Sequence, residues 1–430
     1  MAKDATYEKY QSDVIVDLLK YYGLPYIAMN PGASFRGLHD SIINYGENSP
    51  ELLVCQHEET AVQIAHGYAR ATGKPMGVIL HNLVGMLHAQ MAVYYAYIDR
   101  APIFIMGATG PMHEGKRRPH IDWSHSALTQ GEAMRNYTKW DYQPHAIEGV
   151  PESFMRAYST MVTEPAGPIY MCYDAWLQEE KLTAALDMPP PDMQRAPSPM
   201  AGDPETLGKI VDRLLAAENP LILTDYVGRH EGNFEKLVAL AETLGVPVWD
   251  VNNSLAFPNR HPLNLSMDSD YLKGVDAILG LDLRDWEKPT HKLVSTTREV
   301  TPLAPETCQW MEVGFAEIGM SSWAFDYGRF QPKALSALGD PRLAMPQMTQ
   351  IATEKLSADA ALADKAAKRR QACAARHEKN FAAWAEDAKQ DRDASPLQLA
   401  RLAEEVWSVI RDEDWVCSTG TLRKWARKLW

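Results

Sequence analysis

A chain of 430 residues is too long for one ordinary domain, and its 46% hydrophobic and 23% charged residues predict two or three folded globular domains. The formal net charge of −13 argues against a nucleic-acid partner, because no excess of Lys and Arg is available to neutralise phosphates. The five cysteines lack the paired spacing of zinc or redox sites, and no apolar run reaches the roughly 18 residues that span a bilayer. Residues 1–11 are too polar for a signal peptide, so we expect a cytoplasmic protein with no membrane association.

The first 185 residues alternate short apolar runs with segments of helical period, a pattern typical of a parallel sheet covered by helices. In the helix predicted over residues 57–72, Ala61, Ala65 and Ala69 fall on one apolar face that can pack on the sheet. Strands are expected at Pro25–Met29, Leu52–Cys55, Met76–Leu80, Ile103–Met106 and Pro168–Cys172. The sequence therefore predicts an α/β domain over residues 1–185.

A Pro-rich stretch at residues 188–199 has too many prolines for a helix or a central strand and is interpreted as an extended linker. After it the α/β alternation resumes, which predicts a second, Rossmann-like domain over residues 200–345. Its expected elements are a helix from Pro204, strand Leu221–Thr224, helix Asn233–Leu244, strand Val246–Trp249 and strand Ala277–Leu281.

The rest of the chain divides into a helical segment and an incomplete unit. Residues 346–392 favour helix by composition and are interpreted as a linker. Residues 393–430 resemble the start of a third α/β domain: a helix at Pro396–Ile410, a strand at Trp415–Cys417, a turn of small residues and a basic helix ending at Trp430. One strand and two helices cannot cover both faces of a sheet, so we expect another chain to complete this domain.

One sequence motif indicates a catalytic function. It is QHEETAVQIAHGYARATGKP at residues 56–75. It resembles the pyrimidine-binding signature of thiamine-diphosphate enzymes of the acetolactate synthase and benzoylformate decarboxylase superfamily. In that signature a strand ends in His-Glu, and Gly-Tyr-Ala-Arg follows nine residues after the Glu, which assigns the family's catalytic glutamate to Glu58 rather than Glu59. Further stretches that are similar to the family, over nearly the whole chain, are Asn30–Gly32, Thr138–Trp140, Ala166–Tyr170 and Ala256–Leu263.

The resemblance implies thiamine diphosphate as cofactor and a role for Glu58. A carboxyl group bonded to the pyrimidine N1′ favours the imino tautomer that the cofactor needs to ionise at C2. Such a group works best where burial raises its pKa, and we expect this for Glu58. An isolated Glu at a helix start would otherwise only stabilise the helix dipole. The resemblance also implies cofactor contacts at Pro31 and Gly32, with Ala33 and Ser34 in the substrate pocket.

Histidine residues are the other candidates for catalytic or substrate-pocket roles. Leu80-His81-Asn82 stands where benzoylformate decarboxylase has Leu-His-Ser, whose His is an active-site acid or base, so His81 is either catalytic or structural. His88 stands where the family usually has Asn, and either lines the pocket or packs. The segment from Pro111 to Pro144 is rich in His, Arg and Trp, including the pocket candidates His120 and His125, which would suit a carboxylate or acyl substrate.

Two family features are absent from this sequence. The Phe-Gln-Glu of acetolactate synthases reads His125-Ser126-Ala127, which argues against acetolactate synthesis itself. The Gly-Asp-Gly that leads to the metal ligands is also lacking, since Gly202-Asp203 and Gly339-Asp340 are both followed by proline and lie in the wrong domain.

We therefore expect the remaining contacts of the cofactor to come from two chains. We expect no metal ligands in this chain, with the ligands of Mg²⁺ on a partner, while Ser418, Thr419, Gly420 and Thr421 form a turn that can contact the diphosphate. With no Gly-x-Gly-x-x-Gly sequence, we expect no bound FAD.

Two functions remain open at this point. The first is the large subunit of a split, heteromeric lyase, decarboxylase or carboligase acting on a 2-keto acid or 2-hydroxy carbonyl compound. Its smaller subunit would carry the Gly-Asp-Gly domain, and two long with two short chains would make two complete sites. The alternative is a catalytically inactive scaffold or regulatory subunit that keeps the fold.

Overall fold

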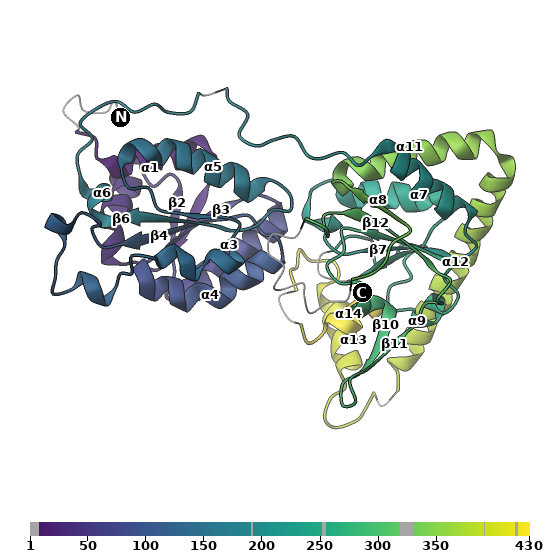
Figure 1. The fold of residues 1–430 in the computed structure, drawn as a ribbon. Coiled ribbons are helices and arrows are strands. Elements are labelled where there is room, and N and C mark those ends of the chain that lie inside the picture. The colour runs from purple at the N-terminus through teal and green to yellow at the C-terminus, as the bar shows by residue number, and fades with distance from the viewer. Residues whose placement is uncertain (1–7, 191, 252–254, 319–329, 391, 418–419) are drawn as a thin grey trace. The chain divides into compact units, whose positions relative to one another are not determined.

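The computed structural model describes residues 8–190, 192–251, 255–318, 330–390, 392–417 and 420–430 (Figure 1). These residues divide mainly into two compact units, one up to Pro199 and one from Met200 onward. Among the described helices, none combines the length and the apolar character that crossing a membrane requires.

The first unit is built on a parallel sheet with the strand order β2-β1-β3-β4-β6-β5. Its strands are β1 (Tyr26–Met29), β2 (Glu51–Val54), β3 (Met76–Leu80), β4 (Ile103–Thr109), β5 (Asp141–Tyr142) and β6 (Ile169–Asp174). Every pairing is parallel, for example Met29 beside Val54 and beside Ile79. The strands therefore all end at one edge of the sheet, and the predicted parallel α/β fold is confirmed.

Helices cover both faces of this sheet (Figure 1). One face packs against α1 (Gln11–Tyr21), α2 (Arg36–Asp40), α5 (Val150–Val162) and α6 (Ala175–Glu179). The other packs against α3 (Glu58–Thr72) and α4 (Asn82–Ile98), whose buried alanines let both helices lie close to the strands. Because β3 and β4 are covered on both sides, all their residues are buried, which is why both are continuous apolar runs in the sequence.

The second unit has its own parallel sheet in the order β13-β12-β9-β7-β8. The strands are β7 (Pro220–Thr224), β8 (Val248–Asp250), β9 (Ala277–Leu281), β12 (Gln309–Gly314) and β13 (Leu335–Leu338), with a separate antiparallel pair, β10 (His291–Val294) and β11 (Glu299–Pro302). One face carries α7 (Pro204–Ala216), α8 (Asn233–Leu244) and α11 (Pro341–Ala358), and short helices α9 (Ser269–Leu272) and α10 (Glu287–Thr290) complete the unit.

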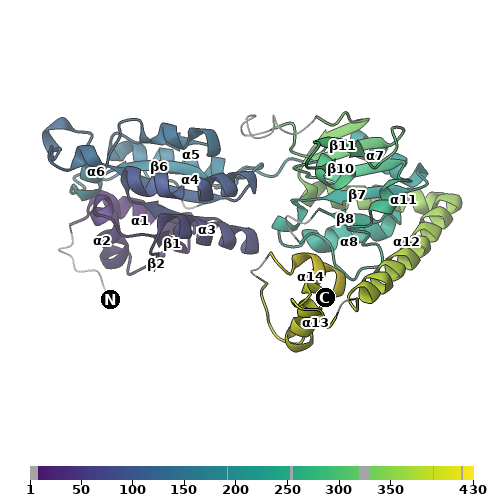
Figure 2. The same cartoon turned by 90° about the horizontal axis from the view of Figure 1, so that it is seen from below.

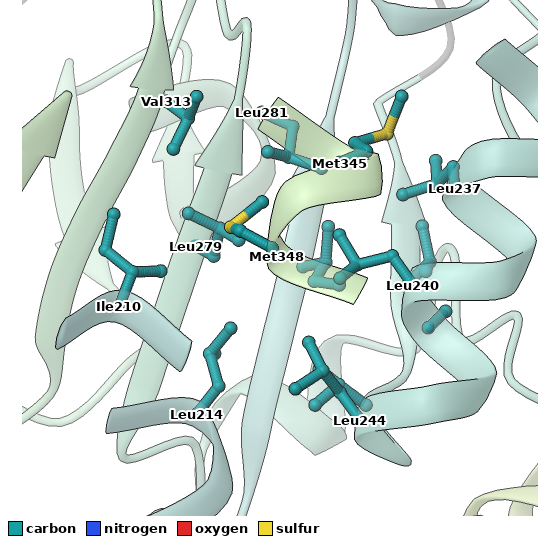
Figure 3. Close-up of a cluster of buried hydrophobic side chains, with 14 of the residues drawn as sticks. Ile210, Leu214, Leu237, Leu240, Leu244, Leu279, Leu281, Val313, Met345 and Met348 are labelled. Atoms are coloured by element: carbon teal, nitrogen blue, oxygen red, sulfur yellow. The ribbon is translucent and has the colours of Figure 1, made fainter. Parts of the chain in front are cut away.

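The largest buried cluster of the second unit lies between this sheet and its three covering helices. Leu279 and Leu281 of β9 contact side chains of α7, α8 and α11, including Met345 and Met348 (Figure 3). The predicted helical linker at 346–392 is helical, formed by α11 and α12 (Ala360–Asp387). However, α11 starts at Pro341 and packs into this core, so part of the segment stabilises the unit rather than only connecting domains.

Arg369 of α12 joins the helices of this unit. Its guanidinium donates from Nη1 to the carbonyls of Leu214 and Ala217, at 2.8 and 2.9 Å, and from Nη2 to that of Leu244 at 2.7 Å. These carbonyls lie at the C-terminal ends of α7 and α8, where the helix dipoles carry partial negative charge. The two helix ends thus stabilise a side chain that is only 9% exposed.

The last segment adds helices α13 (Leu399–Ile410) and α14 (Arg423–Leu429), which lie beside the lower part of α12 in Figure 2. The predicted strand at Trp415–Cys417 is wrong, since these residues belong to no strand. Trp415 instead packs edge-on against Trp407 and Trp430, with ring centroids 5.9 and 5.3 Å apart. A strand needs a neighbouring strand to bond to, whereas this ring cluster is formed within the segment itself.

The ring cluster also covers part of the end of the chain. Trp430 stacks on Trp407 at 5.5 Å and 13°, and its indole N–H donates to the carbonyl of Ala403 at 3.0 Å. Trp430 is half-buried, as are Trp425 and Leu429 of α14.

Candidate functional site

The candidate site lies where the first three strands of the first unit end. Asn30 follows β1, Glu58 opens α3 after β2, and His81 follows β3 and caps α4. Because β1 pairs with both β2 and β3 in parallel, the three strand ends meet at one edge of the sheet. The carboxyl edge of a parallel sheet is the usual place for ligands in α/β proteins.

Glu58 is held by residues from two other strand ends. It is 5% exposed, and its Oε1 accepts a hydrogen bond from Asn30 Nδ2 at 3.0 Å. Its Oε2 lies 3.3 Å from Nδ1 of His88, on α4. The preceding residue, His57, caps α3 by accepting the N–H of Glu59 on Nδ1 at 3.1 Å, so the helix start is fixed. The buried carboxylate therefore has one defined orientation.

The expected rise in the pKa of Glu58 is wrong for this chain by itself. Burial raises the pKa of this carboxyl, but hydrogen bonds from its own backbone N–H, from Asn30 and from His88 lower it, and the net pKa lies below the ordinary value. The donors outweigh burial because they favour the charged form directly. In this state Glu58 is an anion.

His81 is joined to Ser34, another predicted pocket residue. Ser34 Oγ lies 2.8 Å from His81 Nδ1, and Ser34 is buried in the short turn Ala33–Phe35. A Cβ on Gly32 would lie 2.2 Å from His81 Cγ, so only glycine lets this turn approach the imidazole. Burial first, and then the nearby His125, lower the pKa of His81, while Glu58 raises it. A neutral imidazole near pH 7 can accept or relay a proton.

His88 reaches Glu58 because α4 passes close to the start of α3. A Cβ added at Gly85 would lie 3.0 Å from Glu58 Cγ, a tight contact that glycine avoids. His88, one turn further along α4, then points its ring over the carboxylate and stacks on His57 at 5.2 Å and 14°. Its side chain is 60% exposed. Sequence reasoning placed His88 in the pocket but gave no sign of this contact, and it assigned no role to Gly85.

Asn82, directly after His81, is a site residue that sequence reasoning missed. It begins α4 with a positive φ of 22°, an uncommon backbone conformation for any residue except glycine. Its side chain is buried, and Oδ1 has no hydrogen-bond partner among the described residues. A buried acceptor of this kind is stabilised when a bound group supplies a donor.

The predicted pocket residues of the loop after β4 are only partly brought together. His125 lies 5.9 Å from His81, measured between ring centroids, and its carbonyl accepts the N–H of Leu83 at 3.0 Å. His120 is exposed, beside the ion pair of Arg118 with Asp122, and no contact joins it to the site in the described structure. His125 therefore stays a candidate, whereas nothing in the geometry supports His120.

The predicted diphosphate contacts lie in the second unit. Gly420 and Thr421 are exposed and lie just before Leu422, the N-cap residue of α14, while Ser418 and Thr419 lie outside the described residues. Pro31 and Ala33, in the first unit, are exposed beside Gly32. The structure thus brings Glu58, Asn30, His88, Ser34 and His81 together, with the turn at residues 31–33 beside them.

The residues of the first unit fit the pyrimidine half of thiamine diphosphate. A fixed carboxyl group suits a ring nitrogen when one proton is shared between them, and the unpaired acceptor of Asn82 suits an amino group. The diphosphate half is not matched in the same way, because the sequence has no Gly-Asp-Gly and a phosphate-bound magnesium ion needs hard oxygen ligands. The first unit is thus an α/β domain with a buried carboxylate at the carboxyl edge of its parallel sheet, the usual place for a ligand.

Comparison with known proteins agrees with this class. Residues 11–131 match the family model of the thiamine pyrophosphate enzyme, N-terminal TPP binding domain. The chain is 25% identical over 258 residues to an acetolactate synthase large subunit of Lactococcus lactis, covering 60% of this chain and 43% of the relative. It is 25% identical over 284 residues to benzoylformate decarboxylase of Pseudomonas aeruginosa, covering 61% of this chain and 50% of the relative. The chain therefore spans about half the length of these relatives.

Solved structures show the same fold. Benzoylformate decarboxylase from Polynucleobacter necessarius aligns with a TM-score of 0.64 at 21% identity, over 80% of this chain and 61% of that one. Residues 11–131 are thus similar to the N-terminal TPP binding domain of thiamine pyrophosphate enzymes, and about 60% of the chain is similar to acetolactate synthase large subunits and benzoylformate decarboxylase.

Proposed function

We propose that this chain is the large subunit of a split, heteromeric thiamine-diphosphate enzyme that breaks or forms a carbon–carbon bond beside a carbonyl group. Its substrate would be a 2-keto acid or a 2-hydroxy carbonyl compound. The single observation that carries the proposal is Glu58, a buried carboxylate oriented by Asn30 within an intact pyrimidine-binding motif.

Glu58 would bind the pyrimidine ring. When bound, thiamine diphosphate supplies a carbanion at C2 that attacks carbonyl carbons. The carboxylate would exchange the contact between Oε2 and the exposed His88 for one with the cofactor, while Oε1 stays bonded to Asn30. Because Asn30 fixes the carboxyl plane, the released oxygen keeps its direction, and little reorganisation accompanies the exchange.

His81 and Ser34 would act on the substrate side of the site. Their 2.8 Å hydrogen bond holds the imidazole in place, and burial keeps it neutral, so it can hold or accept a proton on Nε2. His125, 5.9 Å away between ring centroids, adds a second imidazole that suits a carboxylate or carbonyl oxygen. This pair supports a 2-keto acid as substrate.

A partner chain is proposed for the diphosphate and Mg²⁺, with cofactor contacts from Gly420 and Thr421 on this chain. The sequence offers no Gly-Asp-Gly, and the described residues leave apolar side chains exposed on one face of α4. Val84, Leu87, Met91 and Tyr95 are 36–48% exposed and lie at helical spacing. An apolar stripe beside the site is the kind of surface that a second chain covers. We propose a smaller subunit in an even heteromer of two long and two short chains.

The proposal is tested on the complex purified from its source with its natural partner. We expect thiamine diphosphate and Mg²⁺ to bind, and a panel of 2-keto acids to release CO₂ or to give ligated products. A complex that exchanges no C2 proton of the cofactor and turns over no 2-keto acid or 2-hydroxy carbonyl compound would refute the enzyme proposal. That result would leave the scaffold role that the sequence also allowed.

A further inference from the structure

Three potential metal ligands gather above the buried edge of the first sheet. His57, Glu58 and His88 each offer one ligand atom, and these atoms lie within 4.8 Å of one another. Within the described parts of the chain, this is the one group of three or more His, Cys, Asp or Glu side chains arranged in this way. Glu58 is buried, while the imidazoles of His57 and His88 are exposed, so an ion can reach the three ligands directly from solvent.

A second layer of contacts orients these ligands. Asn30 Nδ2 donates to Oε1 of Glu58 at 3.0 Å, which leaves Oε2 directed at His88, 3.3 Å away. The bond between Nδ1 of His57 and the N–H of Glu59 places this imidazole beside Glu58 only while no metal is bound. Outer contacts that hold first ligands in place are a general feature of metal sites and raise their affinity.

The ligand types select the kind of metal. Two imidazole nitrogens and one carboxylate oxygen form the three-ligand set of open zinc sites, with a fourth position left for water. Mg²⁺ instead prefers six oxygen ligands, so these histidines do not favour the ion that the cofactor uses. We propose that His57, Glu58 and His88 form a binding site for Zn²⁺ or a similar divalent transition metal, which excludes the cofactor from Glu58.

Binding requires three local adjustments. Nδ1 of His88 donates to Oε2 of Glu58, so His88 must first take the other tautomer, with its proton on Nε2, before Nδ1 can bind a metal. The His57 and His88 rings stack at 14°, so they must tilt until their nitrogen lone pairs point at one ion. His57 must also give up the cap bond from the N–H of Glu59, because neutral imidazole has one lone pair and the metal takes it. Both residues are at the surface, where such movements meet little packing.

The consequence rests on the proposed function. The carboxylate of Glu58 cannot coordinate a metal ion and at the same time bond to a pyrimidine nitrogen. Binding of the metal and binding of the cofactor are therefore mutually exclusive. Transition-metal ions would therefore inhibit the enzyme by preventing cofactor binding, and thiamine diphosphate would displace the metal from the complete complex.

The site is tested with Co²⁺, whose visible absorption reports ligand number and geometry without any enzymatic turnover. We expect the chain to bind one Co²⁺, with Zn²⁺ displacing it, and both His88→Asn and His57→Asn to weaken binding at least tenfold. Asn at position 57 retains a helix cap, which keeps that variant folded. The matched control is His113→Asn, because His113 is exposed and caps a turn through the N–H of Gly115 in the same way, at 3.1 Å.

Unchanged Co²⁺ spectra in both the His57 and His88 variants would overturn the site, as would equal losses in the His113 control. Circular dichroism and melting curves establish that each variant is folded. In the complex, Zn²⁺ should weaken thiamine diphosphate binding for the wild type and much less for His88→Asn. If Co²⁺ remains bound to these residues at saturating cofactor, the exclusion is refuted, and so is the assignment of Glu58 to the pyrimidine; the metal site itself stands.

Discussion

Replacing Glu58 by Gln should abolish turnover and leave the fold nearly unchanged. The amide has the shape of the carboxyl group, so its oxygen can still accept the hydrogen bond from Asn30 that now measures 3.0 Å. Its NH₂ group then faces His88, a donor in the present arrangement, and one contact is lost unless that imidazole turns. Because the His88 side chain is 60% exposed, it can bond to water instead. The expected loss of stability is about 1 kcal/mol or less, that of one hydrogen bond.

The effect on the reaction should be far larger. An amide does not ionise near neutral pH, so it neither gives a proton to a ring nitrogen nor takes one from it, and the variant loses the contribution of a positioned acid or base, roughly 10²- to 10⁴-fold in rate. That loss corresponds to about 3–5.5 kcal/mol of activation free energy. The assay is deuterium exchange at C2 of the cofactor, followed by NMR in the complex with the partner, together with urea unfolding of the variant chain.

Glu59→Gln is the matched control, because it makes the same chemical change at the next residue of the same helix turn. Glu59 is half-buried. Its backbone N–H, which donates to Nδ1 of the N-cap residue His57, is not changed by the substitution. We expect a change of less than about threefold in its exchange rate, since about 0.5 kcal/mol is usual for such surface changes. Equal losses from both variants, or undiminished C2 exchange in the Glu58 variant, would refute the assignment of Glu58.

Three further predictions concern other residues. His81→Ala should slow the steps after C2 ionisation without abolishing deuterium exchange, and wild-type kinetics at every pH would make His81 structural. Burial lowers the pKa of Lys139 to about 8 from 10.5, so the unfolded chain binds this proton more tightly and stability should rise between pH 8 and 10.5. The melting temperature of the wild type should therefore rise relative to that of Lys139→Met over this range, and a constant difference would contradict the shift. Arg369→Met should cost about 3 kcal/mol in urea unfolding, since three carbonyls at helix ends lose a charged donor. Arg370→Met, which removes an exposed donor to one carbonyl, should cost less than about 1 kcal/mol, and equal costs would refute the capping role.

Much of the fold could be predicted because local patterns determine it. The predicted bounds of β3, β9 and α8 equal those observed, since each is a short apolar run or an amphipathic stretch ended by Gly or a polar residue. Elements with weaker signals shifted: β8 begins at Val248 rather than Val246, and α13 at Leu399 rather than Pro396. The strand expected at Trp415–Cys417 failed because three apolar residues do not reveal whether they pair with a strand or pack as rings.

The candidate site could be predicted in part. The motif indicated Glu58, and the family resemblance indicated Gly32, Ser34 and His81, because the stretches that carry the resemblance are local in the sequence. The contacts of Glu58 with Asn30 and His88 join residues 28 and 30 positions apart, on different strand ends and helices, and no local pattern encodes them. The same contacts explain why the expected direction of the Glu58 pKa was wrong.

The measurement that tests the central claim most directly is calorimetric titration of the 430-residue chain alone with thiamine diphosphate and Mg²⁺. The split-enzyme account predicts negligible binding by this chain, with tight, metal-dependent binding restored by the smaller subunit that carries the Gly-Asp-Gly domain. Tight, Mg²⁺-dependent binding by this chain alone, together with turnover of a 2-keto acid, would contradict it.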